Sequence, residues 1–153
     1  MTRFALLLLT FAAPAALAQP VGLSSPAAET DRTAARVTDG VVVLVRQANH
    51  ARAALTTAAE LRRRSAYAGV PIELVVCGGG SQALLAREPD GPALGPELVA
   101  AAERSGVRLI ACGMSLGTLG IDPADLAPGV DVVPNGLLHA IDRQAQGFLS
   151  VEL

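Results

Sequence analysis

The sequence predicts an α/β fold, a single three-layer domain with a mainly parallel sheet of about five strands and helices on both faces. Three observations predict it. Short apolar runs rich in β-branched residues recur along the chain, segments with helical spacing of apolar residues separate them, and glycine or proline stands at most junctions. Continuous apolar runs are typical of strands covered on both faces, and strands that alternate with helices predict parallel pairing.

The first half of the predicted domain contains two strands and the helix between them. Residues 41–45 form the first apolar run, and residues 50–68 carry apolar residues near helical spacing until a glycine and a proline stop the helix. Residues 72–76 form the second strand, which a cysteine and three glycines end. Ser81 is then placed to cap a short helical turn through Leu85.

The second half continues the alternation of helices and strands. Pro96 is well placed as a first helical residue, and Gly106 as the residue that ends the same helix. Asp122 before Pro123 is the pattern of a capped helix start. The other predicted elements are a strand at 107–111, a strand at 130–133, a helix at 137–146 and a final strand at 148–151.

The first residues have the order of a secretory signal peptide. One basic residue, Arg3, precedes an apolar run, and Ala16-Leu17-Ala18 matches the small-residue cleavage pattern. We therefore expect a signal peptide at residues 1–18, a mobile leader at 19–36 and the folded domain at 37–153. The mature chain is expected to be periplasmic or secreted and free of the membrane, because the apolar run is shorter than the about 20 residues that span a bilayer.

Composition excludes several classes of partner. All 12 basic residues are arginine, Asp and Glu together number 14, and the formal net charge is −2. No nucleic acid is expected to bind, because a phosphate backbone requires a basic face and the one basic run, at 62–64, is typical of a solvated helix face. The two histidines and two cysteines lack the short spacing of a zinc site. The glycines at 78–80 match no nucleotide-binding motif and favour a tight turn.

Ligands of parallel sheets collect outside the carboxyl ends of the strands. In this sequence those ends fall at residues 47–50, 77–81, 112–115 and 134–135. Cys112 has the most reactive context there, since Gly113 leaves the backbone open and a helix that begins just after it would favour a thiolate. By topology, His50 is the nearest proton-handling group. His50, Asn49 and Asn135 are therefore candidate supporting residues.

The sequence around Cys112 resembles the carboxyl-terminal half of DsrE-like proteins. The similar segments are GVRLIACGMSL at 106–116, GIDPADL at 120–126 and VDVVPNG at 130–136. The order of elements from residue 41 onward is similar to that family too, so the resemblance covers nearly all of the predicted domain. It implies the flavodoxin-like DsrE fold.

The resemblance also implies a chemistry. In the DsrE-like family, a cysteine at the position that matches Cys112 is associated with carrying sulfur as a persulfide between proteins. Cys112 is then expected to accept a sulfane sulfur and to pass it to a partner thiol, without a metal or an organic cofactor. The implied partners are sulfur donor and acceptor proteins or small sulfur compounds. The resemblance further implies a homo-oligomer, a trimer or a hexamer.

Cys77 has three interpretations: a resolving thiol for Cys112, one half of a structural disulfide, or an inert residue. An exported protein with two cysteines favours a disulfide. A flavodoxin-like strand order 2-1-3-4-5 opposes it, because the second and third strands would then stand about 10 Å apart, beyond the roughly 7 Å limit on the Cα separation of a disulfide. All three interpretations remain open at this point.

The predicted function is an exported sulfur-relay or sulfur-binding protein that carries sulfane sulfur on Cys112, a sulfur carrier rather than a turnover enzyme. The alternative is a non-catalytic binding or assembly module of the same fold with structural cysteines. Free cysteine is among the most buried residue types, so Cys112 could also be a small core residue. Access to its sulfur atom separates these interpretations.

Overall fold

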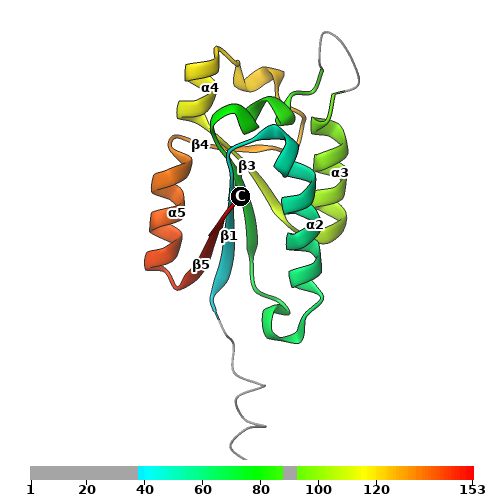
Figure 1. The fold of residues 1–153 in the computed structure, drawn as a ribbon, viewed down its shortest axis with the longest axis vertical. Helices are drawn as coiled ribbons and strands as arrows, with labels where there is room; N and C mark the ends of the chain where they lie inside the picture. The colour runs from blue at the N-terminus through cyan, green and yellow to red at the C-terminus, as the bar shows by residue number, and fades with distance from the viewer. Residues whose placement is uncertain (1–37, 88–92) are drawn as a thin grey trace, which may run out of the picture.

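The structure is a computed structural model that describes residues 38–87 and 93–153 (Figure 1). It contains one five-stranded parallel sheet with the order β4-β3-β2-β1-β5. The strands are β1 (Gly40–Val45), β2 (Ile72–Val76), β3 (Arg108–Cys112), β4 (Asp131–Val133) and β5 (Phe148–Glu152). The predicted α/β class with a parallel sheet of five strands is confirmed. The predicted signal peptide and leader lie outside the described residues.

Helices cover both faces of this sheet. The α-helices are α2 (Ala51–Arg62), α3 (Gly95–Ser105), α4 (Gly113–Leu119) and α5 (Gly136–Ala145). Short 3-10 helices form η1 (Ala48–His50), η2 (Ser65–Tyr67), η3 (Gly78–Leu84) and η4 (Pro123–Asp125). α2 and α3 lie on one side of the sheet, α5 lies on the other, and α4 lies near the end where the strands finish (Figure 1). Within the described ranges, no helix has the length and apolar character needed to cross a membrane.

The strand order differs from the flavodoxin-like order 2-1-3-4-5. β2 lies between β1 and β3, and β5 pairs with β1 at the edge opposite β4. The chain adds β2, β3 and β4 stepwise in one direction, and α5 then carries it back across the sheet, in contact with β3, β2 and β1, to the far edge. The carboxyl ends of β2 and β3, which lead to the two cysteines, are therefore adjacent. The expected separation of about 10 Å between these strands is wrong.

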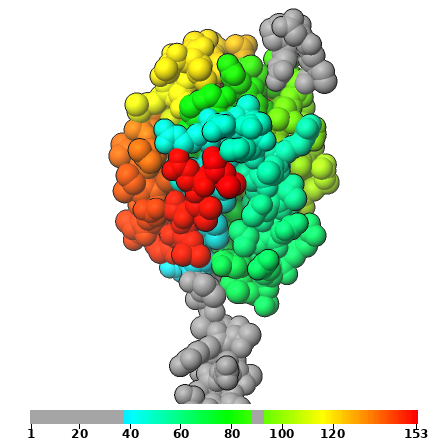
Figure 2. Space-filling view, in the orientation of Figure 1, coloured from blue at the N-terminus to red at the C-terminus, as the bar shows by residue number. Residues whose placement is uncertain are grey.

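The two faces of the sheet bury alternate residues of each strand. Val41, Val43 and Val45 belong to the larger core, which α2 and α3 cover. Val42 and Leu44 belong to the smaller core on the α5 side. Cover on both faces explains why the central strands read as continuous apolar runs. β5 is an edge strand, and Figure 2 shows its residues at the surface between those of α5 and α2.

Backbone conformation explains where the predicted helices end. α3 ends at Gly106 as predicted, where φ is +64° and glycine is favoured. α2 ends at Arg62, earlier than the predicted residue 68, because the backbone becomes extended two residues later and η2 follows. The expected cap at Ser81 is wrong, since η3 already begins at Gly78 and Ser81 is buried inside it.

One buried charge interrupts the predicted apolar strand β2. Glu73 is 1% exposed, and Arg143 of α5 donates to its two carboxylate oxygens at 2.9 and 2.7 Å. Arg108 of β3 donates at 2.8 Å, and Nε2 of His139 lies 2.7 Å from the same carboxylate. Burial raises the pKa of Glu73, but the hydrogen bonds and charges of Arg143 and His139 outweigh it and lower that pKa. These four residues, called the Glu73 cluster below, tie α5 to the sheet.

Candidate functional site

Cys77 and Cys112 are neighbours at the carboxyl ends of β2 and β3. The last paired residues of the two strands are Val76 and Ala111, so each cysteine is the next residue of its strand. The amide of Cys77 still donates to the Val45 carbonyl at 2.7 Å, which shows that the extended ladder continues to this residue. Adjacent strands stand about 4.8 Å apart. Both cysteines are free thiols in the structure.

Hydrogen-bond donors surround the sulfur of Cys112. This residue is 4% exposed, and the Gly136 amide donates to its Sγ at 3.2 Å. The side chain and backbone amide of Ser115 and the Cys77 thiol also act to lower the pKa of Cys112. Burial raises the pKa of Cys112, but these hydrogen bonds outweigh it and lower that pKa. The site therefore favours the thiolate, which is the reactive form of cysteine.

The start of α4 brings Ser115 to Cys112. Ser115 Oγ accepts from the Gly78 amide at 2.7 Å, which leaves the hydroxyl proton to be donated. Gly113 allows the chain to approach β4 closely, since a Cβ at this position would lie 3.1 Å from the Val133 carbonyl oxygen. The open backbone predicted at Gly113 is thus a packing requirement that positions the first turn of α4.

Cys77 is half-buried, and its thiol titrates differently from that of Cys112. Burial raises the pKa of Cys77, and negative charge on Cys112 raises it further, to about 12. The charge of Arg46 acts in the opposite direction and does not compensate. At neutral pH Cys77 is therefore protonated, and of the two thiols Cys112 ionises more readily.

Both cysteines line one pocket of about 250 Å³. Its walls are formed by Leu44, Arg46, Cys77, Gly78, Cys112, Met114, Ser115, Asn135 and Leu137. Met114 and Leu137 are 61% and 56% exposed, so these walls reach the protein surface. Cys112 has little exposed surface of its own, yet it borders a cavity that a small ligand can enter.

Asn135 supports the site indirectly. It is the N-cap of α5, and its side chain accepts from two amides of the first helical turn at 3.0 and 3.2 Å. These bonds fix the start of α5 and hold the Gly136 amide against Cys112. A side chain at Gly136 has no room, because its Cβ would lie 2.7 Å from Cys77 Sγ.

Asn49 and His50 do not line this pocket. They lie in η1 after β1, and β2 stands between β1 and β3. Their expected proximity to Cys112 depended on the order 2-1-3-4-5, in which the first and third strands are neighbours. From the end of β1 it is Arg46 that reaches the pocket, and its guanidinium pairs with Glu152 at 3.2 Å.

Sequence reasoning missed Arg46, Ser115 and Gly136 as site residues. Ser115 falls in the stretch 112–115 that was expected at the strand ends, and Arg46 directly follows the first strand. Their positions at the ends of predicted strands could therefore have identified Arg46 and Ser115. The role of Gly136 could not be predicted in this way, because it depends on how α5 packs against the sheet.

Of the three glycines after Cys77, Gly80 packs tightly and Gly78 has a positive φ of +54°, both consistent with a tight turn. The Gly80 amide donates to the Arg46 carbonyl at 2.8 Å, and a Cβ on Gly80 would lie 3.1 Å from the Val45 carbonyl oxygen. The Gly78 amide is bonded to Ser115. Because protein groups occupy the amides of Gly78 and Gly80, the loop serves close packing rather than anion binding.

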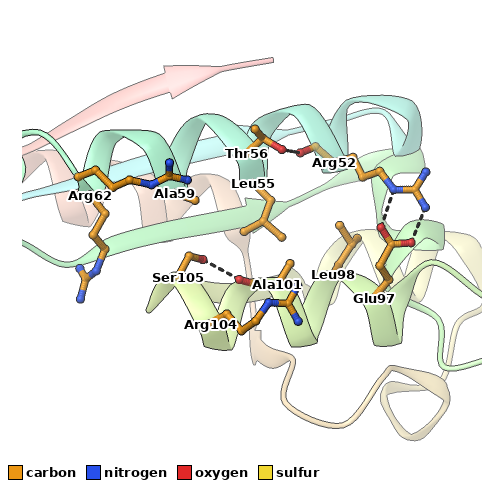
Figure 3. A pocket seen from close by; sticks show the side chains of 11 residues that line it. Arg52, Leu55, Thr56, Ala59, Arg62, Glu97, Leu98, Ala101, Arg104 and Ser105 are labelled. Carbon is orange, nitrogen blue, oxygen red and sulfur yellow. Dashed lines mark hydrogen bonds and ion pairs between the residues drawn. The ribbon is translucent and has the colours of Figure 1, made fainter.

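A larger pocket of about 510 Å³ lies between α2 and α3 (Figure 3). Leu55 and Leu98 extend into the space between the helices, and Arg52 Nε donates to Glu97 at 2.9 Å at one end. Neither a cysteine nor a histidine lines this pocket, and it runs along two helices rather than at the strand ends. In the described parts of the chain, no group of three or more His, Cys, Asp or Glu is arranged to hold a metal. The two-cysteine pocket is therefore the candidate site.

Comparisons with known proteins agree with this fold. The solved structure of MTH1491, a protein of unknown function from Methanobacterium thermoautotrophicum, is similar with a TM-score of 0.60 and 28% identity, covering 74% of this chain and 98% of that one. YchN from E. coli shares the fold with a TM-score of 0.57 and 15% identity, covering 74% and 99%. No curated protein matches the sequence. The model of the DsrE/DsrF-like family matches residues 39–151, and the chain therefore belongs to this family.

Proposed function

We propose that the chain carries sulfane sulfur as a persulfide on Cys112 and relays it from a donor to an acceptor. Membership of the DsrE/DsrF-like family suggests a sulfur-relay type of function. The observation that carries the proposal is the setting of Cys112, whose sulfur borders an open pocket while hydrogen bonds lower its pKa. A buried core cysteine would need neither feature.

The transfer requires no net oxidation. The Cys112 thiolate attacks the outer sulfur of a donor persulfide, R–S–SH, so that a new S–S bond forms on Sγ while the donor S–S bond breaks and R–S⁻ leaves. An acceptor thiolate then attacks the outer sulfur, and the Cys112 thiolate leaves with the electron pair. Donors such as the Gly136 amide stabilise this thiolate both as nucleophile and as leaving group.

The pocket supports a small sulfur compound or a single cysteine side chain of a partner protein as the reacting group. Its volume of about 250 Å³ is below the roughly 300 Å³ at which pockets for drug-sized ligands begin. Leu44 and Leu137 supply apolar walls, and Arg46 supplies a positive charge. Because Arg46 is paired with Glu152 at 3.2 Å, these features favour a compact sulfur species by size rather than by charge.

Loading of the protein with sulfur tests the proposal. The full-length chain is incubated with glutathione persulfide, and its intact mass is measured at once after the donor is removed. We expect a gain of about 32 Da for each sulfur atom carried. Cys112→Ser should show no gain, whereas Cys77→Ser, which keeps the proposed carrier thiol, should still load. Equal uptake by Cys112→Ser and the parent chain would refute carriage on Cys112.

Association of copies is a separate proposal. We expect a homo-oligomer, a trimer or a hexamer. On α5 the large apolar side chains of Leu137, Leu138 and Ile141 are 56%, 57% and 49% exposed, which favours an assembly role for this helix. A monomer mass in light scattering would contradict this expectation.

Export is likewise proposed, from the signal pattern at residues 1–18. The mature amino terminus of the chain recovered from a cell fraction tests it. Cleavage after Ala18 in a periplasmic or secreted fraction is expected, and an uncleaved chain in the cytoplasm would oppose it.

A further inference from the structure

We propose that Cys77 is the resolving thiol of Cys112, and that the pair closes a disulfide which expels the outer sulfur of the persulfide as sulfide. This inference rests on the proposed carriage of sulfur by Cys112. It gives the second cysteine a chemical task and makes the site able to release sulfide as well as to pass sulfur on.

The backbone holds the two cysteines at the separation that a disulfide needs. Each follows directly on the in-register pair Val76 and Ala111. The spacing of adjacent strands, about 4.8 Å, lies inside the range of about 4.4–6.8 Å for the Cα atoms of a disulfide. The strand spacing is therefore compatible with the bond.

The two side chains also point to the same place. A Cβ built on Gly136 would lie 2.7 Å from Cys77 Sγ and 3.0 Å from Cys112 Cβ. Both thiols therefore meet beside the first residue of α5, on one face of the sheet and in one pocket. The glycine at this position leaves room for the Cys77 sulfur and the Cys112 Cβ.

The resolving step balances without an external oxidant. The Cys77 thiol loses its proton and its sulfur attacks Cys112 Sγ, forming the Cys77–Cys112 S–S bond. The S–S bond of the persulfide breaks, and the outer sulfur leaves with the electron pair as HS⁻, which takes up the proton. Two thiol sulfurs are oxidised by two electrons in total, and the sulfane sulfur is reduced to sulfide by the same two electrons. A dithiol reductant then restores both thiols.

The titration of the pair gives the two cysteines their order of action. Because the pKa of Cys77 is raised to about 12 while that of Cys112 is lowered, Cys112 is the thiol that loads. Attack by the Cys77 sulfur needs a sulfur already bound to Cys112 Sγ, because only then is there a leaving group. The resolving step therefore follows loading.

The lifetime of the loaded protein tests the resolving role. The parent chain and Cys77→Ser are loaded with glutathione persulfide, desalted, and followed over time by intact mass and by sulfide released. In the parent chain the gain of about 32 Da should give way to a mass about 2 Da below that of the reduced protein, with one sulfide released per chain. Cys77→Ser should hold the added sulfur at least about tenfold longer. Ser105→Ala, a change in α3 outside this pocket that keeps both thiols, should behave as the parent chain.

The outcomes separate this inference from the proposed function. Equal lifetimes in the parent chain and Cys77→Ser, with Cys112 still loaded, would overturn the resolving role and leave carriage intact. Failure of both proteins to gain sulfur would overturn carriage and the resolving role with it. Peptide mapping of the parent chain after sulfide release provides a test without any variant, because it must show a disulfide between the peptides that contain Cys77 and Cys112.

Discussion

The β2–β3 pair holds a buried acid near each of its ends. Near the amino ends Glu73 is 1% exposed, and at the carboxyl ends Cys112 is 4% exposed. Burial raises the pKa of both groups, yet in both the surrounding contacts outweigh burial and lower it. The same helix, α5, contributes to both sites, with Arg143 bonded to Glu73 and the Gly136 amide bonded to Cys112.

The two sites differ in how they hold their charge. Arg143 and Arg108 bind the Glu73 carboxylate through ion pairs, and His139 adds a third contact. The groups that lower the pKa of Cys112 are neutral donors, the Gly136 amide bonded to its sulfur and the hydroxyl and amide of Ser115. Ion pairs to several cations fix a charge and occupy its lone pairs, which suits a structural clamp. Neutral donors beside an open pocket stabilise a thiolate and leave it able to react, which suits chemistry.

Removing the main cation from the Glu73 cluster should give the largest effect on stability. Arg143→Met keeps an apolar stem but leaves the buried carboxylate without its two-oxygen partner, so we expect the free energy of unfolding to fall by about 3 kcal/mol. Urea unfolding of the variant and the parent chain measures the change. Uptake of sulfur by Cys112 should be unchanged, because the Glu73 cluster lies toward the other end of the strands.

The pH dependence of the same variant sharpens the comparison. Because the pKa of Glu73 is lowered in the folded chain, its contribution to stability is present above the unfolded value of about 4.3 and is lost as pH falls through the folded pKa. In Arg143→Met the pKa of Glu73 rises, so stability should start to fall at a higher pH. Arg52→Met, which breaks the exposed pair with Glu97, is the control. Arg52 lowers the pKa of Glu97, but both side chains are exposed, so acid unfolding should change far less than in Arg143→Met. Identical acid unfolding of Arg143→Met and the parent chain would show that Glu73 does not depend on Arg143.

The fold could be predicted from local patterns, whereas the order of its strands could not. The apolar runs at 41–45 and 72–76 and the stop at Gly106 are local signals, and they lie where β1, β2 and the end of α3 are found. Strand order depends on the edge of the sheet at which each connecting segment places the next strand. No short segment of sequence determines that edge. Glu73 was overlooked for a related reason, since its partners lie on β3 and α5 and meet it only in the folded chain.

Filling the space between the two thiols should give an intermediate effect. In Gly136→Ala the new methyl group would overlap Cys77 Sγ at 2.7 Å and Val75 Cγ1 at 2.9 Å, so we expect a loss of about 2 kcal/mol from overpacking. The displaced sulfur should also slow disulfide closure between the cysteines. Urea unfolding measures the first effect, and oxidation followed by intact mass measures the second.

Gly117→Ala is the matched control for this change. It replaces a glycine of α4 around which a new Cβ would meet no atom within 4 Å. Alanine at a helical position should therefore leave the protein unchanged or stabilise it by about 0.5 kcal/mol. Equal stability of Gly136→Ala and Gly117→Ala would contradict the close packing at the thiol pair.

The reactive cysteine of the candidate site could be predicted from the sequence, whereas most of the residues around it could not. The apolar run before Cys112 predicts its place at a strand end. Asn135 lines the same pocket, and its side chain caps α5. His50 was expected nearby only because of the assumed strand order. Ser115 acts through its hydroxyl and its backbone amide, and Gly136 acts through its backbone amide. Every residue except proline has such an amide, so the residue type does not reveal which amide acts.

The smallest expected effect concerns the hydroxyl of Ser115. Ser115→Ala removes the side-chain hydrogen bond to Cys112 but keeps the Gly136 amide in place, so the pKa of Cys112 should rise toward its ordinary value. One hydrogen bond contributes about 1 kcal/mol, which corresponds to a roughly fivefold slower alkylation by iodoacetamide at neutral pH. Measured in the Cys77→Ser background, the rate reports Cys112 alone. Ser105→Ala, which removes a helix hydroxyl bonded to the Ala101 carbonyl, should leave the rate unchanged. If Ser115→Ala also leaves the alkylation rate unchanged, the backbone amides alone stabilise the Cys112 thiolate. The two sites would then differ in that backbone groups stabilise Cys112 whereas side chains stabilise Glu73.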